Sequence, residues 1–552
     1  MAGSGAVTGA HALVAQLEEL GVRVVFGIPG VHNLAIFDAL RRSSIRTIVV
    51  RHEQTAGYAA DGYARATGLL GVCVTTTGPG AANTAAAMGE ARASRSPVLH
   101  ISTQVESRIL DGKTGRFSLH ESPQQVELMA AVSNWSGRVA RPEAIASMVA
   151  RAAQEAFAGR RGPTFVEIPH DFLSTRVAKA RRAVRAPFPP PAPDEEEIAR
   201  AVDVLTDAKH PIVWAGGGVI SSGATEELLT VAELLDAPVV TTFAGKGAVP
   251  PDHPLGVGFP PHQPEVTKLI NGSDVLLAVG SDFDAMNTQG WRIPFPHPRV
   301  VVNIENDDLR RNYAAEIAIE ADARATLKAL ANKLEPQKRG GAKRAATARD
   351  AARRSLKASA EFKRPFAFVE SLREVVPDNA MVVADMAIAG YWAAAYYPAP
   401  GPRTFAYPLG WGTLGFALPA AIGAAAAGRK VVVTCGDAGF LFAPAELATA
   451  VQEKLDITVL LVNDDGYGML RFDEEERFSD TFAVNLTSPD FVALARSFGA
   501  KARKTTIKKV GADVAWGVKQ KGPVLIQLDA RWAPPLTTSP RWPLKGKREA
   551  RP

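Results

Sequence analysis

Short runs of apolar residues recur along the chain, and each run ends in a turn that contains glycine. Two of them occupy residues 431–434 and 457–460, and residues 24–26 and 211–215 repeat the pattern. Such runs are typical of buried parallel strands, and the sequence after each turn is typical of a helix. The chain is therefore predicted to be α/β, with mostly parallel sheets flanked by helices.

Two acidic residues follow neighbouring strands of this predicted pattern. Asp437 lies in the turn after 431–434, and Asp464 lies in the turn after 457–460, 27 positions further on. This spacing is sufficient for a strand, a crossover helix and a second strand, so both carboxylates can emerge at one sheet edge. Glycine turns that open onto helices, with acids nearby, are suited to holding a phosphate and its metal ion.

These residues resemble a motif of the thiamine diphosphate-dependent enzymes, such as acetolactate synthase and pyruvate decarboxylase. The family carries Gly-Asp-Gly and, further along, Asn-Asn, which correspond here to 436–438 and 463–464. The resemblance implies that thiamine diphosphate and Mg²⁺ bind here, with Asp437, Asp464 and the carbonyl of Gly466 as metal ligands. Ala438 replaces a glycine and Asp464 an asparagine. The added negative charge predicts weaker diphosphate binding or a stronger demand for metal.

A second motif lies near the N-terminus. Residues 24–33 predict a strand, a turn and a helix, and residues 51–65 predict another helix that begins near Glu53. In the family, the matching glutamate hydrogen-bonds N1′ of the aminopyrimidine. A carboxyl kept out of water has a raised pKa and can share a proton with N1′, which favours the imino tautomer of the 4′-amino group. The alternative is an exposed acid at a helix start, where acids are generally favoured.

Two further segments resemble the family. Residues 408–419 match the segment beneath the cofactor, where Gly412 offers its backbone carbonyl to the 4′-amino group and Leu414 supports the folded cofactor; residues 75–83 match the loop beside the pyrimidine. Glycine is suited to a position where the backbone must approach a ligand closely. The resemblance assigns cofactor contacts to Pro29, Gly30, Glu53, Pro79, Asn83, Gly412, Thr413, Leu414, Gly436, Asp437, Ala438, Gly439, Asp464, Gly466, Tyr467, Gly468 and Met469.

The resemblance also implies a reaction and candidate catalytic residues. The cofactor stabilises the enamine left when a 2-oxo acid loses CO₂; a proton converts it to an aldehyde, and a second carbonyl compound converts it to a carboligation product. Besides Glu53, the candidates are His32, which matches a histidine of benzaldehyde lyase, and His120 and Glu121, which match the Gln-Glu pair of acetolactate synthase. His120 is the expected proton donor, because imidazole titrates near neutrality, and Glu121 can orient it.

The chain departs from individual members of this family. The paired histidines of pyruvate decarboxylase are missing, and Leu470 replaces its catalytic glutamate. Residues 386–389 are apolar where acetolactate synthase carries glutamine and histidine near the diphosphate. The chain most resembles acetolactate-synthase-like 2-oxo acid decarboxylases, including the 5-guanidino-2-oxopentanoate type. Alternatives are a 2-hydroxyacyl-CoA lyase, and a catalytically idle cofactor-binding protein, for which the changes at Ala438 and Asp464 are the motive.

Length and composition fit three domains of an ordinary globular protein. The chain has 552 residues, of which 46% are hydrophobic and 22% charged. The proline-rich stretch 186–193 is a stiff linker. Stretches of this kind, rich in proline or in basic residues, predict the domain boundaries. They divide the chain into an N-terminal pyrimidine-binding domain (1–182), a central domain (194–335), a basic linker (336–364), a C-terminal diphosphate-binding domain (365–535) and a basic tail (536–552).

Charge and cysteine content exclude several classes of protein. Residues 338–364 contain ten Lys or Arg and two acids, a net charge of +8, whereas the whole chain carries +6. The basic character therefore comes from a solvated linker and a tail, and no reading element for nucleic acid accompanies it. No run reaches the roughly 18 apolar residues of a membrane span. The two cysteines and the absence of a signal-peptide pattern favour a reducing cytoplasm.

The central domain and the tail leave cofactor and assembly questions open. The glycines at 216–218 follow a predicted strand but lack the Gly-x-Gly-x-x-Gly spacing of a dinucleotide site, so FAD is an alternative that we do not favour. The basic tail can cover the active-site mouth, bind the phosphates of CoA or stay disordered. In the family, the cofactor lies between two chains, so a homodimer or a homotetramer is expected.

Overall fold

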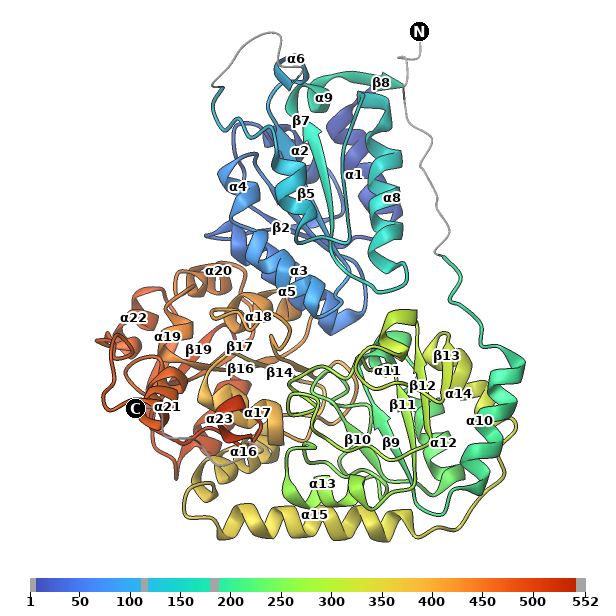
Figure 1. Cartoon of the computed structure of the whole chain (residues 1–552). Helices are drawn as coiled ribbons and strands as arrows, with labels where there is room; N and C mark the ends of the chain where they lie inside the picture. Colours follow the sequence, from blue (N-terminus) through green and yellow to red (C-terminus); the bar gives the residue numbers. More distant parts are fainter. Residues whose placement is uncertain (1–5, 111–117, 179–187, 543–552) are drawn as a thin grey trace.

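The computed structural model describes residues 6–110, 118–178 and 188–542, which form three α/β domains (Figure 1). Each domain is built on a parallel sheet flanked by helices, which confirms the predicted fold class. The apolar runs become strands that are buried along most of their length, since helices cover both faces of each sheet.

The N-terminal domain has a six-stranded parallel sheet. Its strands, in spatial order, are β3 (Arg46–Val49), β2 (Val24–Gly27), β4 (Gly71–Thr75), β5 (Val98–Gln104), β7 (Thr164–Pro169) and β6 (Trp135–Arg138). Its helices are α1 (Gly9–Glu19), α2 (Leu34–Arg41), α3 (Glu53–Thr67), α4 (Pro79–Ala82), α5 (Ala85–Ala93), α6 (Ser107–Leu110), α7 (Gln125–Ala130), η1 (Pro142–Ala144), α8 (Ile145–Phe157) and α9 (His170–Ser174). A small antiparallel pair, β1 (Ala6–Thr8) and β8 (Arg176–Ala178), joins the two ends of the domain.

The central domain has five parallel strands in the order β10 (Val239–Thr241), β9 (Pro211–Ala215), β11 (Val275–Val279), β12 (Arg299–Asn303) and β13 (Ile317–Glu320). Its helices are α10 (Glu195–Asp207), α11 (Gly217–Ser222), α12 (Thr225–Leu235), α13 (Pro264–Asn271), η2 (Asn306–Leu309) and α14 (Ala323–Ala331). The glycines after β9 pack against the end of β11: a Cβ at Gly218 would lie 2.5 Å from the Cα of Gly280. Close backbone packing therefore accounts for this cluster.

The C-terminal domain has six parallel strands in the order β15 (Phe405–Ala406), β14 (Met381–Ala384), β16 (Val431–Gly436), β17 (Ile457–Asn463), β19 (Val524–Asp529) and β18 (Lys501–Thr505). Its helices are α16 (Lys363–Val375), α17 (Ile388–Tyr396), α18 (Ala417–Ala426), α19 (Asp437–Phe440), α20 (Glu446–Gln452), α21 (Gly468–Arg477), α22 (Phe491–Ser497), α23 (Val510–Lys519) and η3 (Ser539–Arg541). Asp437, in the predicted diphosphate-binding motif, thus begins the short helix α19 directly after the buried strand β16.

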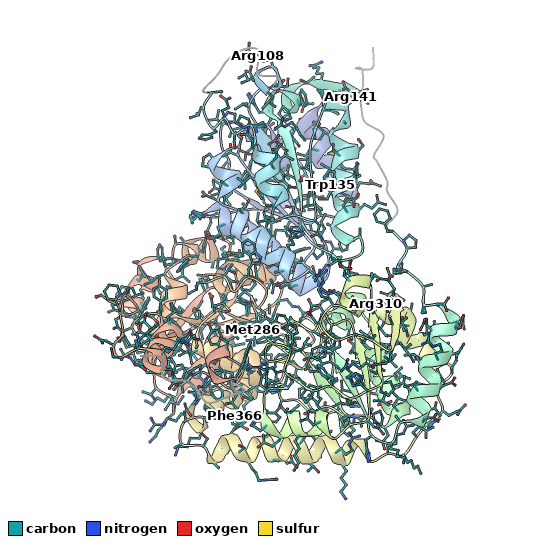
Figure 2. All side chains as sticks on the ribbon, in the orientation of Figure 1. Arg108, Trp135, Arg141, Met286, Arg310 and Phe366 are labelled. Carbon is teal, nitrogen blue, oxygen red and sulfur yellow. The ribbon has the colours of Figure 1, made fainter. Side chains whose placement is uncertain are left out.

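Hydrophobic cores continue from one domain into the next. Helices α3 and α18 pack so closely that a Cβ at Gly62 would lie 2.0 Å from the carbonyl oxygen of Ala420, and one at Gly423 would lie 1.8 Å from that of Ala59. A second core joins the central and C-terminal domains and includes Phe366 of α16, labelled in Figure 2. The C-terminal domain therefore holds both other domains in fixed positions.

The segment 336–364 corrects one prediction. Instead of a solvated linker, it contains the 18-residue helix α15 (Gly341–Ala358), which runs along the central and C-terminal domains (Figure 1). Ala345, Ala348, Ala352 and Leu356 are buried and recur at the spacing of one helix face, while the basic residues occupy the other. The high charge concealed this apolar stripe from a reading based on composition.

Part of the predicted linker 186–193 and of the basic tail 536–552 lies outside the described residues. Within the described part, Arg541 forms an ion pair with Glu361 and lies 4.5 Å from the centre of the Phe472 ring. The ring centre of Trp542 lies 6.1 Å from that of His262. The start of the tail therefore packs on the body of the protein. No helix among the described residues has the length and apolar character needed to cross a membrane.

Candidate active site

Asp437 and Asp464 lie together at the carboxyl edge of the C-terminal sheet. Strands β16 and β17 are parallel neighbours, with Gly436 opposite Val462, so the turns that follow them emerge side by side. The Asp437 carboxylate accepts hydrogen bonds from the backbone N–H of Gly466 at 2.8 Å and of Asp464 at 3.4 Å. The structure thus brings the two acids together, as their spacing predicts.

The two carboxylates disfavour one another's charge. Burial and the neighbouring Asp437 carboxylate raise the pKa of Asp464 to about 7, although Arg471 acts in the opposite direction. The Arg471 guanidinium is engaged with the backbone, since it donates to the carbonyl oxygens of Asp464 and Asp465 at 3.0 and 2.9 Å. A cation placed between the two acids would relieve this repulsion.

A cavity of about 240 Å³ opens beside these acids. The predicted cofactor residues that line it are Gly412, Leu414, Gly436, Asp437, Ala438, Gly439, Asp464, Gly466, Tyr467, Gly468 and Met469. Residues 386–389 and Leu470, where the chain departs from its relatives, also line it. Tyr391, Val462, Ala530 and Trp532 complete the wall and were missed. Ala530 and Trp532 directly follow β19, so the sequence could have placed them at the carboxyl edge of the sheet, where the cavity lies.

The glycine turn after β17 leaves room for nothing larger than hydrogen. A Cβ at Gly468 would lie 1.8 Å from an Oδ atom of Asp464. Gly466 has a φ of +145°, and a Cβ there would lie 2.1 Å from the carbonyl oxygen of Val484. Glycine at both positions therefore sets the place of the Asp464 carboxylate at the cavity wall.

A buried acid that the sequence analysis did not single out holds the third motif in place. The carboxylate of Asp385, directly after β14, accepts hydrogen bonds from the backbone N–H of Met386 at 2.8 Å, and of Gly415 and Ala417 at 3.1 Å. Burial raises its pKa to about 6, while these N–H groups act to lower it. Asp385 therefore fixes the turn that carries Gly412, Thr413 and Leu414.

The remaining predicted residues gather at the carboxyl edge of the N-terminal sheet. Glu53 is the first residue of α3, and its carboxylate accepts a hydrogen bond from the side-chain amide of Asn83 at 3.0 Å. Pro79 begins α4, and the turn after β2 contains Pro29 and Gly30. None of these residues lines the cavity of the same chain, within the part of the chain that the structure describes. The predicted site is therefore divided between two places.

The position of Glu53 depends on the C-terminal domain. The buried carboxylate of Glu446, the first residue of α20, accepts hydrogen bonds from the backbone N–H of Arg51 at 3.0 Å and of His52 at 3.2 Å. The residues immediately before Glu53 are thereby anchored across the domain boundary. Sequence reasoning missed this contact, because nearly 400 positions separate its partners.

Three histidines meet near Glu53's edge of the sheet. The ring of His32, after β2, has its centre 5.5 Å from that of His120 and 5.1 Å from that of His170, the first residue of α9. The structure thus brings the predicted pair His32 and His120 together and adds His170, which sequence reasoning missed. Glu121 lies beside them, and its carboxylate accepts a hydrogen bond from the Ser118 backbone N–H at 2.9 Å.

A buried polar network supports the loop that carries His120. Gln125 accepts hydrogen bonds from the Gly78 backbone N–H at 2.8 Å and donates to the carboxylate of Glu167 at 2.9 Å. Glu167 is fully buried and forms an ion pair with Arg138. His120 itself has a φ of +63°, an uncommon conformation for a residue with a side chain. The network therefore holds a strained residue in place.

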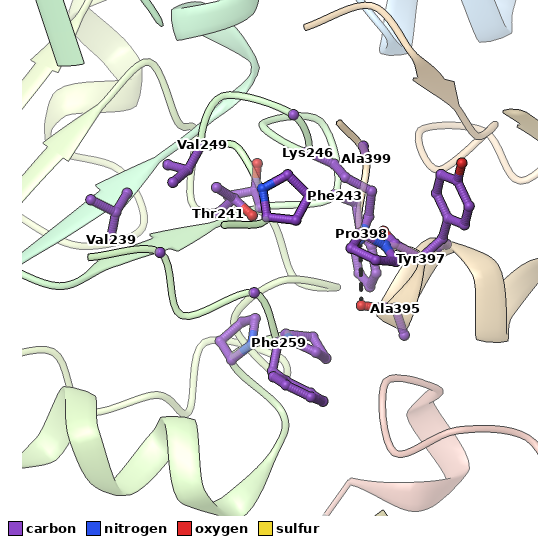
Figure 3. Close-up of a pocket in the computed structure, with 18 of the residues that line it drawn as sticks. Val239, Thr241, Phe243, Lys246, Val249, Phe259, Ala395, Tyr397, Pro398 and Ala399 are labelled. Atoms are coloured by element: carbon purple, nitrogen blue, oxygen red, sulfur yellow. Dashed lines mark hydrogen bonds between the residues drawn. The ribbon is translucent and has the colours of Figure 1, made fainter. Parts of the chain in front are cut away.

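A second cavity lies between the central and C-terminal domains (Figure 3). Its volume is about 50 Å³, which is room for only a few water molecules. The Lys246 ammonium reaches across it and donates to the carbonyl oxygens of Ala395 at 3.5 Å and Tyr397 at 3.0 Å. Removal from water lowers the pKa of Lys246 to about 7. This contact fastens the two domains together.

Known proteins resemble the chain over nearly its full length. Three family profiles match it: the thiamine pyrophosphate enzyme N-terminal TPP binding domain at 7–130, the central domain at 198–330 and the C-terminal TPP binding domain at 385–528.

Individual relatives give the same result. A probable 2-ketoarginine decarboxylase of Pseudomonas aeruginosa is 36% identical, over 95% of this chain and 94% of that protein. A probable acetolactate synthase large subunit of Methanocaldococcus jannaschii is 32% identical, over 90% and 87% respectively. The acetolactate synthase large subunit of Corynebacterium glutamicum is 34% identical, over 91% and 83%.

Proposed function

The chain belongs to the thiamine pyrophosphate enzymes, and on that basis we propose that it decarboxylates a 2-oxo acid without oxidation, with or without carboligation to a second carbonyl compound. The observation that carries this proposal is the cavity at the carboxyl edge of the C-terminal sheet, where Asp437 and Asp464 meet the turn that contains Gly412. The full-length relatives named as a decarboxylase and as acetolactate synthases support both outcomes.

Thiamine diphosphate, when bound, supplies an electron sink for the loss of CO₂. The chain's own residues would hold it as follows. The Glu53 carboxyl, which accepts a hydrogen bond from Asn83, would share a proton with N1′. The backbone carbonyl of Gly412, at the cavity wall, would accept a hydrogen bond from the 4′-amino group. Leu414, at the cavity wall, would pack between the aminopyrimidine and thiazolium rings and support the folded cofactor. Backbone N–H groups at the helix starts in the turns 436–439 and 466–469 would bind the diphosphate.

Mg²⁺ is the metal that this site fits. Asp437, Asp464 and the carbonyl of Gly466 supply three oxygen ligands, and Mg²⁺ prefers oxygen, commonly from carboxylates together with phosphates and water. Among the described residues, no three His, Cys, Asp or Glu side chains form a complete metal cluster. In this proposal the protein would supply three of the six ligands of an octahedral shell, and the diphosphate and water would supply the other three.

We propose that two chains share each active site. The cavity of one chain contains the metal ligands, while Glu53 and the histidines lie at another edge. Around that edge, Val31 is 74% exposed and Leu119 65% exposed, and beside the cavity Trp411 is 55% exposed. Val31 and Leu119 adjoin His32 and His120, whose ring centres lie 5.5 Å apart, and exposed apolar side chains that gather at one place are typical of interaction surfaces. A homodimer that covers them places Glu53 of one chain against Asp437 of its partner, and two dimers can form a tetramer.

A mixing experiment tests the shared site. Glu53→Gln and Asp437→Ala proteins should each be inactive. Subunit exchange should restore activity, because one of the two shared active sites of a mixed dimer carries both wild-type groups. An inactive mixture, after exchange is demonstrated with differently tagged subunits, would rule out sharing.

The reaction itself is tested with purified protein, thiamine diphosphate and Mg²⁺. A panel of 2-oxo acids, beginning with 5-guanidino-2-oxopentanoate because of the 36% identical relative, is assayed for CO₂, aldehyde and acyloin. We expect CO₂ from at least one 2-oxo acid, with all of the decarboxylated carbon recovered as aldehyde or as acyloin. A 2-hydroxyacyl-CoA in the panel detects the lyase alternative. Bound cofactor without any turnover would instead support an idle binding protein.

A further inference from the structure

We propose that His170 completes a proton-donating site with His32 and His120, which protonates the decarboxylated substrate carbon and so directs the reaction toward an aldehyde. The inference rests on the proposed function and specifies its outcome. His32 lies at the centre of the cluster, with the rings of His120 and His170 within 5.5 Å on two sides. The three rings come from segments far apart in the sequence, the turn after β2, the turn around His120 and the start of α9, so the cluster exists only in the folded domain.

Unsatisfied hydrogen-bonding groups point to a ligand at this cluster. The Nδ1 atoms of His32 and His120 are buried and have no hydrogen-bond partner, and His32 is only 9% exposed. Buried polar atoms are nearly always paired, so an unpaired one needs an explanation. A substrate group that accepts or donates a proton at these nitrogens supplies it. The left-handed backbone conformation of His120 costs conformational energy, which a loop residue with a purely structural role has no reason to carry.

The position of the cluster suits this role. His32 follows β2 and His170 follows β7, while Glu53 follows β3, and all three strands belong to one parallel sheet. Their side chains therefore emerge at the same carboxyl edge. In the shared site proposed above, that edge faces the cavity of the partner. The groups that activate the cofactor and protonate the product are thus presented by one rigid surface.

The proton balance requires such a donor. Conversion of a 2-oxo acid anion to an aldehyde and CO₂ consumes one proton. When the bond to the carboxylate breaks, its electron pair stays with the substrate carbon; that carbon then forms a C–H bond as an imidazolium N–H bond breaks. The neutral imidazole regains its proton from water, with the half-buried His170 as the intermediate ring.

Neighbouring charges favour release of this proton. Burial, followed by the charges of His170 and His120, lowers the pKa of His32. The acids on the flanking elements are already engaged: Glu121 accepts from the Ser118 N–H, and Asp171 accepts from the N–H and hydroxyl of Ser107 at 2.9 and 2.6 Å. A protonated ring therefore sits beside other imidazoles without a free carboxylate to retain the charge.

The experiment separates protonation from the steps before it. His170→Gln is compared with wild type in two assays: aldehyde release, and CO₂ release coupled to hexacyanoferrate(III). Two equivalents of this oxidant take one electron each from the decarboxylated carbon before it is protonated, and water then releases that carbon as a carboxylic acid. We expect aldehyde release to fall roughly 10-fold or more, as for loss of a general acid. Coupled CO₂ release should stay within about 2-fold of wild type by the same reasoning. His210→Gln, at an exposed position in the central domain, is the matched control and should change neither rate.

Two further readouts exclude a structural explanation. The first is an NMR titration of cofactor-free protein labelled with ¹³C at histidine Cε1, in which removal of His170 should raise the pKa of His32. The second is chemical rescue, in which free imidazole should restore aldehyde release to His170→Ala. An equal loss in both assays, or an unchanged His32 titration, would overturn the proposal. Wild-type protein that releases no CO₂ in either assay would instead refute the proposed function, a result that the titration does not depend on.

Discussion

Replacing Gly468 by alanine tests whether Asp464 is held at the position that the proposed metal site requires. Gly468 begins α21, and a Cβ there would lie 1.8 Å from an Asp464 Oδ atom, whereas ordinary contact begins at 3.4 Å. The carboxylate or the helix start must therefore move by about 1.6 Å. Metal–ligand distances tolerate only about 0.2 Å. We expect Gly468→Ala to weaken cofactor binding in the presence of Mg²⁺ by about 10- to 100-fold, or about 1.4–2.8 kcal/mol.

Calorimetric titration of thiamine diphosphate into the cofactor-free protein measures this loss. Folding stability should fall by no more than about 1–3 kcal/mol, the usual cost of overpacking, so the variant should remain folded. Gly401→Ala is the control, since a Cβ there has no atom within 4 Å and its φ is not positive. If Gly468→Ala folds and binds the cofactor with wild-type affinity, Asp464 does not occupy the position that this reasoning requires.

Two other substitutions test neighbouring acids. Asp464→Asn removes one of two facing carboxylates, so the affinity for thiamine diphosphate with Mg²⁺ should hold or rise; a folded variant that no longer binds Mg²⁺ would contradict the ligand assignment. Burial raises the pKa of Asp385 to about 6, above its unfolded value, so its contribution to stability is complete below about pH 4 and is lost as the pH rises through 6. Wild type should therefore lose about 2 kcal/mol relative to Asp385→Asn between pH 4 and 7, measured by unfolding at both pH values, and a constant difference would argue against it.

The arrangement of the C-terminal site could be predicted because its determinants are local. Apolar runs specify buried strands, and neighbouring parallel strands must end at one edge, so the spacing of Asp437 and Asp464 was sufficient to bring them together. The glycines after β17 carry the same information, since they mark where the backbone lies against a carboxylate. Helix α15 was missed because composition was read without its period of buried alanines.

Residues that act across long separations could not be found in this way. Asp385 holds a turn 30 positions away, and Glu446 anchors the residues before Glu53 from 395 positions away. His170 and His32 meet only in the folded sheet, because they follow strands β7 and β2, which β4 and β5 separate. In each case the chemistry depends on tertiary packing, and one acid or histidine in a loop is no different in sequence from a surface residue.

Deuterium uptake at C2 of bound thiamine diphosphate is the most direct test of the central claim, that Glu53 activates a cofactor held between Asp437, Asp464 and Gly412. Quenched-flow exchange followed by ¹H NMR measures it without any substrate. Wild-type protein with Mg²⁺ should exchange C2 much faster than the free cofactor does, and Glu53→Gln should bind the cofactor but lose most of that acceleration. Near-wild-type exchange in Glu53→Gln, or no acceleration by the wild-type protein, would contradict the account.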